Sequence, residues 1–92
     1  MIAAEDRLRI IEDLLVQALA PDSLQVEDES HLHIGHAGAK DGRGHFRVTI
    51  VSDQFCGKNL LARHRAIYKA LGELMKTDIH ALSIEAISSD EI

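Results

Sequence analysis

Three consecutive segments decide the fold: HFRVTIVS at residues 45–52, LLARHRAIYKALGELM at residues 60–75 and IHALSIEA at residues 79–86. In the first segment Phe46, Val48 and Ile50 alternate with other residues, which is typical of a strand with one buried face. The second segment has apolar residues at intervals of three and four and predicts a helix over 59–76. The third alternates again, so a strand, a helix and a further strand predict a parallel pair joined by a right-handed crossover.

Upstream of this unit the sequence predicts a helix over residues 4–20, which Pro21 ends. Leu24 and Val26 then alternate with polar residues and predict a short strand, antiparallel to the next one. The order helix, strand, strand, helix, strand predicts an α+β fold, a two-layer sandwich with a three-stranded mixed sheet. We expect one domain over residues 1–92, with a frayed tail at residues 88–92.

A glycine- and histidine-rich stretch separates the first two predicted strands. Residues 31–45 contain four of the six histidines and four of the six glycines, without hydrophobic periodicity, so we expect a mobile loop over 31–44. Neutral imidazole is the commonest protein ligand of transition metals. With Cys56 as its single cysteine, the chain cannot build a thiolate metal site alone. These features predict a protein that lends ligands to a site shared with a partner.

Composition limits the possible compartments and partners. The net charge of −5 disfavours a general polyanion binder, although residues 53–76 carry five basic against two acidic side chains. No apolar run approaches the length of a membrane span, and the first residues lack the basic and apolar regions of a signal peptide. A single cysteine fits a reducing compartment. We therefore expect a cytoplasmic protein without membrane contact.

Several motifs give the chain a family resemblance. His45-Phe-Arg-Val-Thr-Ile-Val-Ser52, Phe55-x-Gly57, Leu61-x-Arg63-His64-Arg65-x-Ile67-Tyr68 and Ile79-His80-Ala81-Leu82 follow one another in an order that resembles the BolA family. The resemblance implies a fold similar to the type II KH domain. It also implies partnership with a monothiol glutaredoxin, with a bridging [2Fe–2S] cluster, and roles in transcription, cell morphology and stress.

The resemblance also implies particular ligands. The family's cluster-binding histidine maps onto His80, and a second ligand from the loop maps onto His36, nine residues before His45. His33 and His45 are the alternative loop ligands. The partner would supply one thiolate and bound glutathione another, and histidine ligation would raise the reduction potential of the cluster. We expect the isolated chain to be a monomer without a cluster.

Other interpretations of these residues remain open. Loop histidines can be ordinary solvated side chains, and His64, on the predicted apolar face with Leu60 and Ile67, is expected to be a core residue. A basic helix face of Arg63, Arg65 and Lys69 would contact the glutaredoxin, glutathione carboxylates or phosphates, or would simply be solvated. The alternative function is a DNA-binding transcriptional regulator of stress and morphology genes that uses this face.

Enzyme and clamp motifs have little support. The chain has no P-loop, no G-x-S-x-G and no H-E-x-x-H motif. Cys56 and His64 are eight residues apart, a spacing that indicates no catalytic dyad. Gly35-His-Ala-Gly38 matches the GXXG clamp of KH domains, but it lies between two predicted strands and not between helices. We expect a protein that is not an enzyme.

Overall fold

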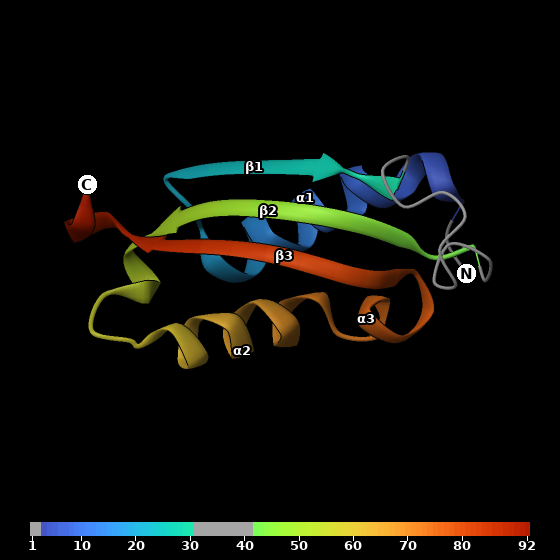
Figure 1. The fold of residues 1–92 in the computed structure, drawn as a ribbon. Helices are drawn as coiled ribbons and strands as arrows, with labels where there is room; N and C mark the ends of the chain where they lie inside the picture. The colour runs from blue at the N-terminus through green and yellow to red at the C-terminus, as the bar shows by residue number, and fades with distance from the viewer. Residues whose placement is uncertain (1–2, 31–41) are drawn as a thin grey trace.

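The computed structural model describes residues 3–30 and 42–92. Helices α1 (Arg7–Leu19) and α2 (Leu60–Leu71) combine with strands β1 (Ser23–Asp28), β2 (Gly44–Ser52) and β3 (Ile79–Ser88) (Figure 1). Short helical turns complete the described chain: η1 (Ala4–Asp6), η4 (Asp53–Phe55), α3 (Leu74–Thr77) and η5 (Ser89–Glu91). The predicted α+β class and element order are confirmed. Most of the loop predicted over 31–44 lies outside the described residues, and its last residue, Gly44, begins β2.

The sheet has the order β1-β2-β3. Strand β1 pairs antiparallel with β2, and β2 pairs parallel with β3, as predicted. The register places Asp28 opposite Phe46 and Gly44 opposite Ile79. The end of β1 and the starts of β2 and β3 therefore meet at one end of the sheet. We call this end, formed by Asp28, Gly44 and Ile79, the histidine edge.

The two main helices pack on one face of the sheet. Figure 1 shows α1 behind β1 and β2, and α2 along β3. The opposite face is polar, and there the exposed Arg47 donates to the Glu29 carboxylate at 3.2 Å. The core is mostly aliphatic, with one phenylalanine from β2 and one from η4. Its buried members include Ile11, Leu15, Leu19, Val26, Phe46, Val48, Ile50, Phe55, Ile67, Leu71 and Ala86.

Helix α2 differs from the prediction in both length and orientation. It ends at Leu71 because Gly72 adopts a positive φ of 54°, and the short α3 follows. Its buried residues are Arg63, Ile67 and Leu71, whereas the expected core residue His64 is partly exposed. The helix is thus rotated by about one residue from the orientation that its apolar residues predict. The side chains left exposed by this rotation are Leu60, Leu61 and Tyr68.

The observed orientation of α2 buries Arg63 among hydrogen-bond acceptors. Its Nε donates to the Lys58 carbonyl at 2.8 Å, and its Nη1 donates to the Ala86 carbonyl at 3.0 Å and to Glu91 Oε1 at 2.7 Å. A buried guanidinium is tolerated only where such acceptors converge. Because two of the three acceptors come from distant parts of the chain, the α2 sequence alone gives no sign of them.

The same arginine also contacts the C-terminal tail, residues 88–92, for which the sequence predicts fraying. Turn η5 has a capping box in which the Glu91 carboxylate accepts from the Ser88 backbone N–H at 2.7 Å. The Arg63 guanidinium, together with the Ser88 N–H, lowers the pKa of Glu91 from 4.5 to about 2. The Ser88 hydroxyl lowers the pKa of Asp90. Arg63, Ser88 and Glu91 thus form a hydrogen-bonded group at the C-terminal end of β3.

We predict that Glu91→Gln lowers the free energy of unfolding at neutral pH. Since the pKa of Glu91 is lower in the folded chain, its carboxylate stabilises the fold above pH 4.5, and this stabilisation is lost as the pH falls to about 2. Chemical denaturation of both proteins across this range is the test. The difference between them should shrink toward low pH. A difference that is constant with pH would contradict the assigned role of the carboxylate.

Candidate functional site

His80 lies at the histidine edge and is the second residue of strand β3. The β2–β3 register shifts between Gly44, opposite Ile79, and His45, opposite Ala81, so His80 is an extra residue without a partner position. This bulge lets Ile79 fill the core, with 1% of its surface exposed, and leaves His80 exposed. Strict alternation along β3 would direct the His80 side chain to the core with Leu82, and the register shift prevents this. The exposed position is the one that a ligand to an external group requires.

His45 is the described histidine that lies against His80. The ring centroids are 5.1 Å apart and the planes are tilted by 52°. His45 is buried, and both of its ring nitrogens are enclosed. In this arrangement His45 supports the His80 ring, and neither of its nitrogens is accessible to a group outside the chain. The other predicted loop ligands, His36 and His33, lie outside the described residues.

Arg43 covers one nitrogen of the exposed imidazole. Its Nη2 lies 3.1 Å from Nδ1 of His80. Arg43 follows Gly42, whose φ of 82° favours glycine, and it is half-buried immediately before β2. No sequence signal pointed to Arg43, because its contact joins residues that are far apart in the chain.

The histidine-rich segment is anchored at both ends beside His80. On the incoming side, the Glu29 N–H donates to the His45 carbonyl at 2.8 Å, and the Ser30 hydroxyl accepts from the His45 N–H at 3.1 Å. On the outgoing side, the Gly44 N–H donates to the Asp78 carbonyl at 2.9 Å. These bonds hold the described residues on either side of 31–41 at the histidine edge.

A buried ion pair between Arg7 and Asp78 lies directly beside the histidine edge. Arg7, at the start of α1, donates through Nε to Oδ1 of Asp78 at 3.1 Å, and both side chains are almost completely buried. Thr77 donates its hydroxyl to the other carboxylate oxygen at 2.6 Å. Asp78 directly precedes Ile79 and His80, so the pair connects the first helix to the backbone that presents the candidate ligand.

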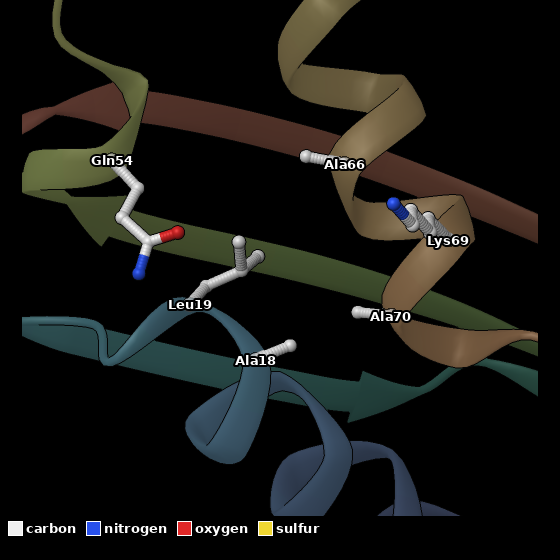
Figure 2. A pocket seen from close by; sticks show the side chains of 6 residues that line it. All are labelled: Ala18, Leu19, Gln54, Ala66, Lys69 and Ala70. Atoms are coloured by element: carbon white, nitrogen blue, oxygen red, sulfur yellow. The ribbon is translucent and has the colours of Figure 1, made fainter.

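The predicted basic face of α2 is only partly exposed. Arg65 and Lys69 are exposed, whereas Arg63 is buried and bonded within the chain, so the structure corrects its assignment to a contact face. Lys69 borders a hollow of about 380 Å³ between the end of α1 and α2. Figure 2 shows Ala18, Leu19 and Gln54 on one side of it and Ala66 and Ala70 on the other. These small and neutral linings provide no metal ligand.

The described residues hold no complete metal site. Within 3–30 and 42–92, no three side chains of histidine, cysteine, aspartate or glutamate gather closely enough to hold a metal ion. The same part of the chain contains no helix long and apolar enough to cross a membrane. The site thus consists of one exposed histidine, a buried histidine behind it and an arginine beside it.

Comparison with known proteins identifies the family. The model of the BolA-like proteins matches residues 15–91. The Arabidopsis thaliana Protein BOLA1, chloroplastic, is 44% identical over 92 residues, which are 97% of this chain and 58% of the relative. The Escherichia coli protein named DNA-binding transcriptional regulator BolA is 42% identical over 81 residues, or 88% of this chain and 74% of the relative. The chain belongs to the BolA-like family.

A solved structure supports the same conclusion. The BolA domain of SufE1 from Arabidopsis thaliana superimposes with a TM-score of 0.84 at 40% identity, over all of both chains. This chain spans 26% of the Arabidopsis SufE-like protein 1 and 58% of BOLA1, less than two thirds of either relative. The predicted family and fold are thereby confirmed.

We predict that Asp78→Asn lowers the free energy of unfolding by about 3 kcal/mol, because it leaves the buried Arg7 charge without its counterion. Urea denaturation measures the change. The control is Glu73→Gln, which breaks the exposed pair with Lys76, 3.8 Å long, and should change stability by less than about 0.5 kcal/mol. Equal effects of the two substitutions would show that the Arg7–Asp78 pair does not support the fold.

Proposed function

We propose that this chain is an iron–sulfur adaptor that binds a monothiol glutaredoxin and shares a [2Fe–2S] cluster with it. His80 and His36 of this chain would supply nitrogen ligands, and the partner and its bound glutathione would supply thiolates. The observation that carries the proposal is the exposed His80, placed where both ends of the histidine-rich segment are fixed.

The metal-binding side chains of this chain fit a cluster site shared with a partner better than a site built by this chain alone. Two irons require four protein or thiol ligands in addition to the bridging sulfides. The described residues offer one accessible imidazole and no cluster of three metal-binding side chains. Cys56 is exposed but lies just beyond the opposite end of β2, after η4, far along the strand from the histidine edge. The described residues cannot complete the site by themselves, which supports the proposal that a partner supplies ligands.

The covalent chain allows the second ligand to reach this edge. His36 is six residues after Ser30 and seven before Arg43, and both anchors lie close to His80. His33 has similar reach and is the alternative. His45 is a weaker candidate than the sequence predicts, because both its nitrogens are enclosed.

The adaptor is proposed to be non-catalytic and to function in iron sensing or cluster transfer. Among the described residues, the exposed His80 contacts an arginine and a histidine ring, and no hydroxyl or thiol that it could activate. We propose the cytoplasm, where the exposed Cys56 would stay a thiol. Two relatives are named for the chloroplast or mitochondrion, so those reducing compartments are the alternative.

The test is co-expression with a monothiol glutaredoxin, followed by absorption, circular dichroism and pulsed EPR of the reduced complex. We expect two nitrogen couplings in the wild type and a colourless monomer when the chain is purified alone. His80→Ala should remove the histidine-ligated spectrum, and His36→Ala should weaken it, with partial rescue by His33.

His64→Ala is the matched control, because His64 is partly exposed on α2 and away from the histidine edge. Its complex should keep both couplings. Couplings that are unchanged in the His80 and His36 variants would reject the proposed ligands. A stable [2Fe–2S] spectrum from the isolated chain would reject the shared site.

A second candidate function is DNA binding, which the name of the Escherichia coli relative favours. Arg65 and Lys69 are the exposed basic residues of α2 that would contact phosphates. Each phosphate contact adds about one unit to the slope of log affinity against log salt.

We predict that the double variant Arg65→Ala and Lys69→Ala reduces this slope by about two on duplex DNA, whereas Arg47→Ala on the opposite sheet face leaves it unchanged. Salt-independent binding of the wild type would exclude this function.

A further inference from the structure

The contact between Arg43 and His80 determines which nitrogen of His80 carries the proton. A guanidinium is always protonated and can only donate hydrogen bonds. The Nη2 group 3.1 Å from Nδ1 of His80 must therefore donate, and Nδ1 must accept. A neutral imidazole has one acceptor nitrogen and one N–H group. With Nδ1 accepting, the proton resides on Nε2.

In this arrangement neither nitrogen of His80 has a free lone pair for a metal ion. Metal ligation requires an unprotonated nitrogen with a free lone pair. The Nδ1 lone pair is directed at Arg43, and Nε2 carries the proton. In established histidine–metal sites the ring usually donates its other N–H to an acceptor, and an arginine cannot play that part.

The positive charge of Arg43 acts in the same direction. The charge lies within hydrogen-bond distance of the imidazole, and an approaching metal cation would be repelled by it. His80 is exposed, so without such protection it would be open to any dissolved divalent ion. The enclosed His45 ring behind it offers no second accessible nitrogen.

We propose that Arg43 is a positioning residue that withholds the His80 lone pair from metals in the free chain and must move away before His80 can bind one. The functional meaning rests on the proposed function, since it makes ligation at His80 conditional on the rearrangement that complex formation brings. The tautomer itself is a property of the free chain and is measured without a glutaredoxin or a cluster.

The first test reads the tautomer directly. Long-range ¹H–¹⁵N spectra of the imidazoles are recorded on the free ¹⁵N-labelled protein in mildly alkaline buffer, with His80 assigned by its absence in His80→Gln. We expect the proton on Nε2 in the wild type and in Arg43→Lys, which can also only donate. Arg43→Glu should move the proton to Nδ1, because a carboxylate accepts from it. The same tautomer in the wild type and Arg43→Glu would overturn the proposal.

The second test measures access of a metal, with Zn²⁺ alone as the probe. The His80 ring resonances are followed during titration of the free protein. Arg43→Ala should bind Zn²⁺ at His80 about tenfold more tightly than the wild type, which corresponds to the loss of one charge-assisted hydrogen bond. Arg43→Lys should stay close to the wild type.

The control for charge alone is Arg47→Ala. Arg47 lies on β2, two residues after His45, and it pairs with Glu29 and not with His80. This variant should leave the Zn²⁺ affinity at His80 unchanged within about twofold. Equal affinities of the wild type and Arg43→Ala would overturn the proposal, and so would equal gains in Arg43→Ala and Arg47→Ala. A failed glutaredoxin experiment would reject the adaptor function and leave the tautomer result standing.

Discussion

Asp78 is the residue on which the histidine edge depends. Its carboxylate pairs with the buried Arg7 of α1, and its backbone carbonyl accepts from Gly44 at the start of β2. The next residue, Ile79, begins β3 in the core. One residue thus joins the first helix, the central strand and the last strand at the point where the candidate ligand is presented. A buried charge is stable only with its counterion, so these elements must assemble together.

The bulge beside Gly44 places His80 on the surface of the histidine edge. Without the extra residue, strict alternation would direct His80 into the core with Leu82 and Ile84 and expose Ile79. Gly44 also has no room for a side chain, because a Cβ atom there would lie 2.6 Å from the Phe46 ring. Burial of Ile79 and close packing at Gly44 together explain why the histidine is placed outside.

Two arginines show opposite uses of the same side chain. Arg63 is buried, satisfies acceptors from three parts of the chain and contacts the C-terminal tail. Arg43 lies at the surface and contacts one imidazole nitrogen. A planar, permanently charged donor suits both tasks, because it can bridge several acceptors and cannot itself accept a proton. In the first case this stabilises the fold, and in the second it would determine the tautomer of the candidate ligand His80.

The sequence by itself determined the strands and their parallel and antiparallel pairing, because alternation and helical periodicity report directly on which residues are buried. The family resemblance came from the order of its motifs. It also identified His80, through a short local motif. It did not determine the rotation of α2, the contacts of the C-terminal tail, the outward orientation of His80 or the contact of Arg43. These depend on acceptors and steric contacts from residues 23 to 71 positions away, such as Ala86, Glu91 and Asp78. Only the tertiary structure brings those groups together, and so only it decides which side chains a partner can reach.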